Sequence, residues 1–328
     1  MKTSSTDLNS TSDARDRLQA LQKSLTKAIP GQDDLIENLL LGFIAGGHVL
    51  LEGLPGLAKT TLVRLLAQGL GLPFGRVQMT PDLMPADIVG SSILKPDLSG
   101  FVFLPGPVFT TILLVDELNR APARVQSALL EAMQEQQVTA GGETRPLAPL
   151  FWVVATQNPI EQEGTYPLAE SQKDRFSLRL RVNYPPTNQE SAVIGMIHDP
   201  LDQPFSESGL TPTDFQLLRT IHENIHMSDL IVQWATRLVQ ATREPSLVNV
   251  NQKVAWGVSP RGARMWLKVA RVRAWWHGRD YLIPEDLRQT ADSALSHRIQ
   301  VAWNARRIEH SEKSLPLVLE LMNAIGPP

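Results

Sequence analysis

The chain has 328 residues, which is enough for two domains or for one large domain with a smaller companion. Its hydrophobic content of 42% is typical of a globular protein with a sizeable core. With Lys+Arg 31 and Asp+Glu 34, the net charge of -3 argues against general binding to nucleic-acid backbones, although it leaves room for a local basic stripe. The absence of cysteine excludes disulfides and thiolate metal sites, and it fits a reducing cytoplasm.

The N-terminal segment gives no sign of export. Residues 1–17 are rich in Ser, Thr and Asp and lack an apolar core, so we expect a disordered leader and not a secretory signal. The longest uncharged stretch, Asn38 to Leu51, is interrupted by glycines and is shorter than the roughly 20 apolar residues that cross a bilayer. These features predict a cytoplasmic protein without a membrane span.

Apolar residues recur at helical spacing from Leu18 to Ile44, with a break at Pro30-Gly31. Short apolar runs typical of buried strands follow, separated by helical segments: Val49–Leu51, Gly75–Met79, Ile112–Val115, Phe151–Ala155 and Leu178–Val182. This alternation predicts an α/β domain over residues 18–186, with a parallel five-stranded sheet flanked by helices. Right-handed crossovers would bring the carboxyl ends of the strands, and any ligand, to one edge.

Two hairpin patterns interrupt this alternation. Ser91–Leu94 and Phe101–Phe103 flank a turn at Asp97-Leu98-Ser99-Gly100, and Val138-Thr139 and Thr144 flank Gly141-Gly142. The residues alone leave open whether these hairpins are surface decoration or functional inserts.

The composition changes after Tyr184-Pro185-Pro186. Three helices are predicted beyond it, at Asp214–Arg243, Ser259–Trp276 and Pro284–Ile299, so we expect residues 187–328 to form a second, all-helical domain. We expect the tryptophans of this region to fill its core and not to form a ligand cage: Trp234, Trp256, Trp266, Trp275, Trp276 and Trp303.

A phosphate-binding loop is predicted between the first strand and the following helix. Its residues are Gly53, Leu54, Pro55, Gly56, Leu57, Ala58, Lys59 and Thr60, and they match the pattern G-x-x-x-x-G-K-[ST] except at Ala58. We expect Ala58 to be tolerated because the position leads into the helix. Backbone N–H groups of such a loop encircle a β-phosphate, and the helix N-terminus favours negative charge. Lys59 would reach the β- and γ-phosphates, the Thr60 hydroxyl would ligate Mg²⁺, and Thr61 completes the predicted nucleotide contacts.

Two carboxylates follow the buried strand run Ile112–Val115. Asp116 and Glu117 would therefore lie at the ligand edge of a parallel sheet. We expect Asp116 to hold Mg²⁺ and Glu117 to orient and deprotonate the attacking water. One acid at a strand end is often only a solvated residue, but two acids downstream of a Lys-Thr loop favour a catalytic pair.

Another buried strand, Phe151–Ala155, is followed by polar residues that end in Asn158. From the strand beside the acidic pair, the Asn158 amide could hydrogen-bond a γ-phosphate or the attacking water. Together these residues predict ATP binding with Mg²⁺ and its hydrolysis.

These motifs together resemble the MoxR family of AAA+ ATPases. The resemblance rests on the loop from Gly53 to Thr60, on Asp116 to Pro122, on Ala155 to Pro167 and on Glu170 to Phe176. It extends from about Leu18 to the end of the chain, and Ala before the loop lysine is itself common in that family.

The resemblance adds site residues beyond the three motifs. Asn158 matches the family's sensor 1 position, and Arg175 matches the arginine finger that enters a neighbouring subunit's site. Arg261, within Ser259-Pro260-Arg261, matches sensor 2 on the helical lid. Gly31 and Gln32 match the adenine-side turn, although Pro30 stands where Val or Ile is more usual.

The resemblance also implies a biological role. It implies a homo-oligomeric, hexameric ring that remodels or matures client proteins as a chaperone, with a separate von Willebrand factor A-domain partner in another chain. The two hairpins fit the helix-2 insert and the pre-sensor hairpin of this AAA+ branch. Arg120 and Arg179 remain competing candidates for the finger, and Arg175 and Arg261 could also be ordinary ion-pair residues.

Three other functions compete with this one. A chelatase-type motor subunit for metal insertion shares the same machinery. An MCM-like nucleic-acid motor is disfavoured because the hairpins offer only Lys95 as a nearby cation. A non-enzymatic nucleotide-dependent scaffold is disfavoured because Lys59 and Glu117 are both present.

Overall fold

The computed structural model describes residues 5–96, 100–159, 164–195, 200–202, 205–301 and 314–328, and its contacts divide the chain into two units. The first unit comprises residues 1–40, 48–168 and 180–216, and the second comprises residues 41–47, 169–179 and 217–328. The main division therefore falls at 216/217, about 30 residues beyond the predicted boundary at 186. Two short segments from the α/β region, 41–47 and 169–179, belong by their contacts to the second unit.

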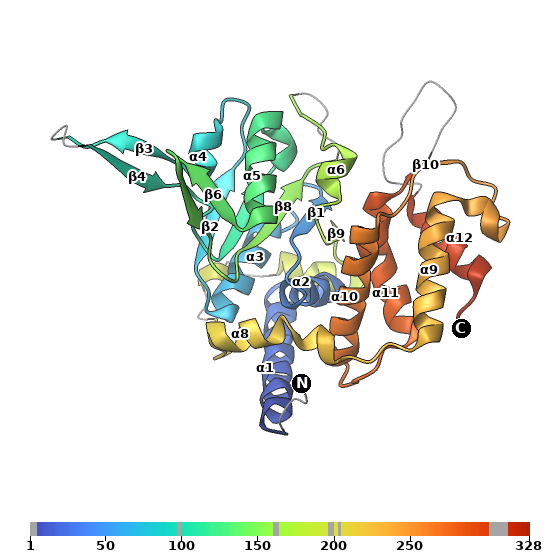
Figure 1. Cartoon of the computed structure of the whole chain (residues 1–328). Helices are drawn as coiled ribbons and strands as arrows, with labels where there is room; N and C mark the ends of the chain where they lie inside the picture. Colours follow the sequence, from blue (N-terminus) through green and yellow to red (C-terminus); the bar gives the residue numbers. More distant parts are fainter. Residues whose placement is uncertain (1–4, 97–99, 160–163, 196–199, 203–204, 302–313) are drawn as a thin grey trace. The chain divides into compact units, whose positions relative to one another are not determined.

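A five-stranded sheet organises the α/β region (Figure 1). Its order is β2-β5-β8-β1-β9, with strands β1 (Val49–Gly53), β2 (Phe74–Gln78), β5 (Ile112–Asp116), β8 (Trp152–Gln157) and β9 (Leu178–Val182). The pairings of β2 with β5, of β5 with β8 and of β8 with β1 are parallel. The predicted strands are confirmed to within about two residues at each end. Every residue of β5 is buried, as near-continuous apolar runs in a central parallel strand require.

Helices flank this sheet. They are α1 (Ser5–Ala28), α2 (Asp33–Ile44), α3 (Lys59–Leu70), α4 (Pro85–Val89), α5 (Ala123–Glu135) and α7 (Thr187–Ile194), with one-turn helices at Leu118–Arg120 (η1) and Pro200–Asp202 (η2). The short helix α6 (Glu170–Lys173) belongs by its contacts to the second unit. The predicted break at Pro30-Gly31 separates α1 from α2. Gly71 ends α3 in a left-handed conformation, with φ 66°.

The predicted disordered leader at residues 1–17 is wrong from Ser5 onward, because α1 begins there. Thr11 and Ala14 are buried and continue, at spacings of three and four, the apolar stripe of Leu18, Leu21 and Leu25. A Cβ added at Gly69 of α3 would lie 2.3 Å from Leu21, so the stripe packs closely on α3. Thr11 and Ala14 are small enough to be buried on a helix face. For this reason the polar composition of residues 1–17 led to the wrong prediction of disorder.

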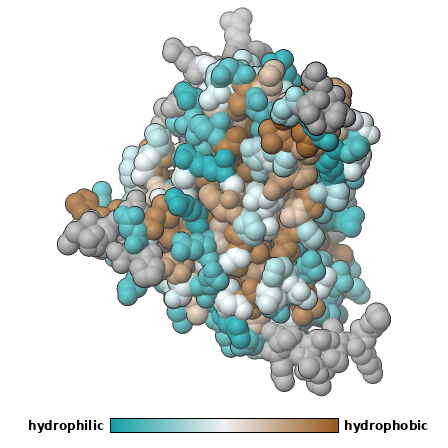
Figure 2. Space-filling view, turned by 90° about the vertical axis from the view of Figure 1, so that its left-hand side faces the viewer, coloured by the Kyte–Doolittle hydropathy of each residue, from teal (hydrophilic) through white to brown (hydrophobic). Residues whose placement is uncertain are grey.

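Both predicted hairpins are confirmed as antiparallel pairs. β3 (Gly90–Leu94) pairs with β4 (Phe101–Pro105), and β6 (Gln137–Ala140) pairs with β7 (Glu143–Pro146). Most of the first predicted turn, residues 97–99, lies outside the described residues. β3–β4 projects at the left of Figure 1, on the face that Figure 2 shows, and it exposes Ile93 44%, Leu94 48%, Phe101 73%, Val102 44% and Leu104 57%.

The second unit is mainly helical. Its elements are α9 (Asp229–Arg243), α10 (Pro260–Trp276), α11 (Pro284–Leu295) and α12 (Ser314–Ile325), with one-turn helices η3 (Ile221–Asn224), η4 (Pro245–Val248) and η5 (Ser296–Arg298); α8 (Pro212–Leu218) crosses the boundary. A short antiparallel pair, β10 (Val254–Trp256) with β11 (Gln300–Val301), is an addition to the predicted all-helical domain.

The predicted helix Asp214–Arg243 is interrupted. Backbone hydrogen bonds from His226 N to Asp280 O and from Leu282 N to His226 O hold this part extended, and Ser228 then caps α9. Extended segments ending at a serine cap are hard to distinguish from helix by apolar spacing alone.

The tryptophans of the second unit are mostly core residues, as predicted. Trp234, Trp266, Trp275 and Trp276 are buried. Trp256 is an exception, with 64% exposure on β10, and Trp303 lies outside the described residues.

Among the helices of the described residues, none combines the length and apolarity of a membrane span.

Candidate functional site

The predicted phosphate loop lies where expected, between the end of β1 and the start of α3. Gly53 must be glycine because a Cβ there would lie 2.7 Å from the carbonyl oxygen of Val182 on β9. Pro55 and Gly56 are exposed, and Gly56 has φ +83° with nothing within 4 Å of an added Cβ. The loop therefore presents backbone at the carboxyl end of the sheet, with Thr60 and Thr61 in the first turn of α3.

Ala58 differs from the expectation. It has φ 53° and ψ 22°, a left-handed conformation that favours glycine, and it does not yet belong to the helix. The alanine costs about 1–2 kcal/mol relative to an unstrained backbone. Strain of this kind is concentrated at functional sites, where the surrounding structure holds it in place.

The Lys59 ammonium lies within the loop, where Nζ donates hydrogen bonds to the carbonyl oxygens of Gly53 and Leu54, the latter at 2.8 Å. Burial lowers the pKa of Lys59, whereas the negative charges of Asp116 and Glu117 oppose that shift. The side chain is thus a cation held among loop carbonyls beside two carboxylates.

Asp116 is buried, with 5% exposure, and both of its carboxylate oxygens accept hydrogen bonds. Oδ2 accepts from Arg76 Nε at 2.7 Å and from Thr60 Oγ1 at 3.4 Å, and Oδ1 accepts from Thr156 Oγ1 at 3.3 Å. The predicted magnesium ligands Thr60 and Asp116 are therefore neighbours.

Glu117 has left-handed backbone geometry, with φ 56° and ψ 50°. Its N–H donates to Thr156 Oγ1 at 2.9 Å, which fixes this strained position. Its Oε2 accepts from Gln78 Nε2 at 2.8 Å and from Arg120 Nη1 at 3.0 Å. The predicted catalytic base is thus held by two side-chain donors.

Asn158 follows β8 and is buried, with 8% exposure. β8 lies between β5 and β1, with Val115 opposite Ala155 and Leu51 opposite Thr156. The carboxyl ends of these three parallel strands thus bring the loop, the acidic pair and Asn158 to one edge of the sheet.

The predicted adenine-side residues lie against the segment that follows β9. Gly31 has φ +83°, and a Cβ there would lie 2.8 Å from Pro185 Cβ. Gln32 is buried, and its Nε2 donates to Asn183 O at 2.8 Å. The Gln32 amide is therefore engaged in holding the chain after β9, a contact that the sequence did not predict.

Arg175 and Arg261 both belong to the second unit. Arg175 is half-buried and follows α6, and Arg261 is exposed in the first turn of α10. The competing arginines are engaged elsewhere: Arg120 binds Glu117, and Arg179 is buried with Nη2 donating to Ser296 Oγ at 3.0 Å. These contacts within the chain favour Arg175 over Arg120 and Arg179 as the candidate arginine finger.

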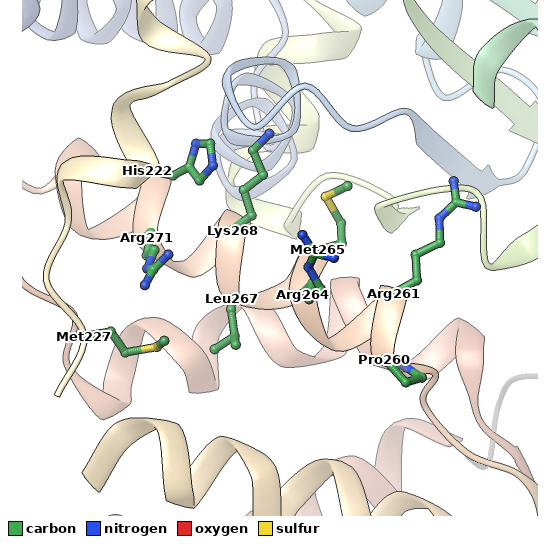
Figure 3. A pocket seen from close by; sticks show the side chains of 9 residues that line it. All are labelled: His222, Met227, Pro260, Arg261, Arg264, Met265, Leu267, Lys268 and Arg271. Atoms are coloured by element: carbon green, nitrogen blue, oxygen red, sulfur yellow. The ribbon is translucent and has the colours of Figure 1, made fainter. Parts of the chain in front are cut away.

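A cavity of about 530 Å³ in the second unit is lined mainly by α10 (Figure 3). Its cationic residues include Arg261, Arg264, Lys268 and Arg271, with His222 from η3 beside Lys268. Burial and the charge of Arg219 lower the pKa of Lys268, and burial together with Lys268 lowers the pKa of His222. The α10 face thus carries concentrated positive charge.

Three contacts to the acidic pair were missed by the sequence reasoning: Arg76 and Gln78 on β2, and Thr156 on β8. The signal in the sequence that could have predicted two of these contacts was the pair of polar residues at positions 76 and 78. Positions two apart in a strand share one face of the sheet, and Gln78 lies opposite Asp116 in register.

Comparisons with known proteins agree with this arrangement. A family model described as "ATPase family associated with various cellular activities (AAA)" matches residues 48–178, and an AAA lid domain model matches residues 248–316. A crystal structure from Cytophaga hutchinsonii, provisionally assigned as an ATPase, superposes with a TM-score of 0.86 at 36% identity and covers 98% of both chains.

Curated relatives narrow the assignment. The chain is 43% identical to "Chaperone MoxR1" of Mycobacterium tuberculosis over 282 aligned residues. The aligned region covers 85% of this chain and 74% of that protein. It is 40% identical to "Uncharacterized protein YeaC" of Bacillus subtilis over 93% of this chain and 92% of the relative. It is 32% identical to "Protein MoxR" of Methylorubrum extorquens over 95% of this chain and 96% of the relative. The fold, the order of motifs and these relatives show that the chain belongs to the MoxR family of AAA ATPases.

Proposed function

We propose that this chain hydrolyses ATP with Mg²⁺ at the carboxyl edge of its sheet. The observation that carries the proposal is the convergence of the loop around Lys59, the carboxylates of Asp116 and Glu117, and Asn158 at adjacent strand ends. Phosphoryl transfer needs mainly positioning and charge stabilisation, and this set of groups supplies both.

The residues at the site fit a magnesium ion. Thr60 Oγ1 and Asp116 Oδ2 lie 3.4 Å apart, and a hydroxyl with one carboxylate is the hard oxygen set that Mg²⁺ accepts alongside phosphate oxygens and water. When bound, the ion would neutralise charge on the β- and γ-phosphates. Thr60 and Asp116 would hold it, and Lys59 would supply a second positive charge to the same phosphates.

Glu117 would act on the attacking water. Gln78 and Arg120 hold one of its carboxylate oxygens, so the other can accept a hydrogen bond from water. Asn158 would orient the γ-phosphate or that water. The hydrogen bond from the Glu117 N–H to Thr156 Oγ1 holds the Glu117 backbone in place for this role.

We further propose a homo-oligomeric ring, most simply a hexamer, in which Arg175 completes the neighbouring subunit's site and Arg261 acts on its own nucleotide. An arginine finger of this kind contributes roughly 10³–10⁵ to the rate in other P-loop enzymes. The engagement of Arg120 and Arg179 within their own chain supports Arg175 for this role.

The ring would remodel or mature client proteins in the cytoplasm, with a separate von Willebrand factor A-domain protein as partner. The relative named a chaperone supports this role. So does hairpin β3–β4, whose exposed side chains include Phe101 at 73% and Leu104 at 57%, because apolar side chains suit contact with a polypeptide. A chelatase-type motor subunit uses the same site and would differ in its client.

A nucleic-acid motor is less well supported. In the structure the second hairpin also includes Arg145, a cation that was not among those predicted for the hairpins. Its guanidinium lies 3.9 Å from the Phe103 ring centroid and pairs with Glu143, so it is directed to protein contacts.

Subunit mixing tests the shared site. Lys59→Ala should not bind nucleotide, and Arg175→Ala should bind it without efficient turnover. Each variant alone should therefore be inactive, and a mixture should recover activity wherever an intact loop meets an intact finger. Mixed rings, verified by light scattering or native mass spectrometry, that show no recovered ATPase activity would contradict the proposal.

A further inference from the structure

The chain segment that carries Arg175 is clamped by a buried arginine. The Arg298 side chain is 2% exposed, and its Nε donates to Asp174 Oδ1 at 2.7 Å. Its Nη2 donates to Phe176 O at 2.7 Å, and its Nη1 donates to Ser177 O at 3.3 Å. A guanidinium with this many protein acceptors fixes the conformation of the segment on both sides of Arg175.

The same Asp174 holds the start of α10. The Ser259 hydroxyl donates to Asp174 Oδ2 at 3.0 Å and accepts from Gly262 N at 3.0 Å. Ser259 is therefore both the N-cap of α10 and a link to Asp174. Arg261 lies within that capped first turn, so one carboxylate connects the surroundings of both arginines.

The packing around this carboxylate leaves little space. A Cβ added at Gly262 would lie 2.5 Å from Arg298 Cδ and 3.3 Å from Asp174 Oδ1. Next to the clamp, His297 bonds Phe176 O through Nε2 at 3.1 Å. All these residues belong to the second unit, so their contacts form one continuous packed network.

We propose that Asp174, through Ser259 and Arg298, is a positioning residue that fixes Arg175 and Arg261 in one rigid body. This inference rests on the proposed function, in which Arg175 acts on the neighbour's nucleotide and Arg261 on the chain's own. Any displacement of the α10 terminus by a bound nucleotide is then carried to Arg175. The state of one site thereby reaches the next site through the Ser259–Asp174 hydrogen bond.

Ser259 is the residue to change, because its loss leaves the Asp174–Arg298 ion pair in place. Ser259→Ala removes the helix cap and the link to Asp174 together. Ser228→Ala is the matched control: Ser228 caps α9 by accepting from Ile231 N at 3.4 Å. Ser259→Thr keeps a hydroxyl and should preserve both functions. Circular dichroism and thermal unfolding would verify that each variant is folded.

Two mixtures separate the two arginines, starting from the pair Lys59→Ala plus Arg175→Ala. In the first, Ser259→Ala is added to the Lys59→Ala chain, which supplies only the finger. In the second, it is added to the Arg175→Ala chain, which supplies only the nucleotide site. A misplacement of about 1 Å can cost 10²-fold in rate, so we expect kcat to fall about tenfold to a hundredfold in both mixtures.

The controls and outcomes are distinct. Ser228→Ala and Ser259→Thr should match the parent mixture in both arrangements. A loss in only one arrangement, or in neither, would overturn the proposal, because a rigid link must disturb both arginines. If the parent mixture of Lys59→Ala and Arg175→Ala is inactive although mixed rings form, the proposed shared ATPase site is wrong, and this proposal is wrong with it. If the parent mixture is active and Ser259→Ala changes neither mixture, only the proposed link through Asp174 is refuted.

Discussion

Arg76 Nε lies 2.7 Å from Asp116 Oδ2, the same carboxylate oxygen that the Thr60 hydroxyl approaches to 3.4 Å. A guanidinium from the edge strand β2 thus engages the oxygen that is proposed to face magnesium. The pair is asymmetric in exposure: the Arg76 side chain is 51% exposed and that of Asp116 8%. Arg76 can therefore leave into solvent, whereas Asp116 cannot.

Removing Arg76 is expected to strengthen magnesium binding, because it removes a competing cation. A half-exposed pair of this kind is worth about 0.2–1 kcal/mol, so Arg76→Met should lower the Mg²⁺ concentration for half-maximal nucleotide binding by roughly 1.5- to 5-fold. A magnesium titration with a fluorescent ATP analogue measures this. Arg64→Met, on the exposed face of α3, is the control. A requirement for more Mg²⁺ would mean that Arg76 orients Asp116 and does not compete.

The left-handed conformation of Ala58 predicts an unusual stabilising substitution. Ala58→Gly relieves about 1–2 kcal/mol of backbone strain and loses about 0.4–1 kcal/mol through the more flexible unfolded chain. The free energy of unfolding should rise by roughly 0.5–1 kcal/mol, as measured by urea denaturation. Gly56→Ala is the reciprocal control: with φ +83° and no steric neighbour, it should destabilise through the backbone alone. Destabilisation by Ala58→Gly would show that the strain is absent.

His297 should make the stability of the second unit pH-dependent. Complete burial, together with Arg298 and Arg179, lowers the pKa of His297 well below its usual value. The unfolded chain therefore binds a proton near pH 6.5 that the folded chain does not. Stability is fully present above about pH 6.5 and is lost as the pH falls below it, by at most about 1.4 kcal/mol per pH unit.

His297→Gln, which can still donate to Phe176 O, should reduce that slope. Urea denaturation at pH 5 to 8, followed by tryptophan fluorescence, compares the two chains. An unchanged slope in the variant would assign the acid sensitivity to other groups.

Lys268→Met should stabilise the fold at neutral pH. Burial and the nearby Arg219 charge both lower the pKa of Lys268, so its positive charge opposes folding. Because Lys268 is partly exposed and screened, we expect a gain of a few tenths to about 1 kcal/mol. The folded chain binds the Lys268 proton less tightly than the unfolded chain does, so the free energy of unfolding of the wild type rises as the pH approaches 10.5. The stability advantage of Lys268→Met should therefore shrink over the same pH range. Thermal unfolding of Lys268→Met and the wild type at pH 7 and pH 10 measures both effects. A lower Tm for Lys268→Met than for the wild type at pH 7 would contradict the prediction.

The fold was largely predictable because its apolar runs have clear periods. β5 and β8 are nearly fully buried, so their sequences carry an unbroken apolar signal. The extension of α1 to Ser5 was missed because Thr11 and Ala14 are weakly apolar although they continue the buried stripe. The β10–β11 pair was missed because two or three residues carry no usable period.

The candidate site was predictable where one motif follows one strand. Lys59 ends the loop that follows β1, Asp116 is the last residue of β5 and Asn158 directly follows β8, and parallel strands bring these positions together. Arg76 and Arg298 were not predictable, because each contacts a residue far away in sequence: Asp116 and Asp174, respectively. The conformation of Ala58 likewise follows from tertiary geometry that its neighbours in sequence do not specify.

Glu117→Gln gives the most direct test of the central claim that this sheet edge hydrolyses ATP. The variant keeps the shape of the side chain but cannot take a proton, so it should bind Mg·ATP with near wild-type affinity. Its turnover should fall by about 10²–10⁴-fold, the usual contribution of a general base. Lys59→Ala, as reference, should lose binding in the same calorimetric titration. Hydrolysis by Glu117→Gln at the wild-type rate would contradict the account.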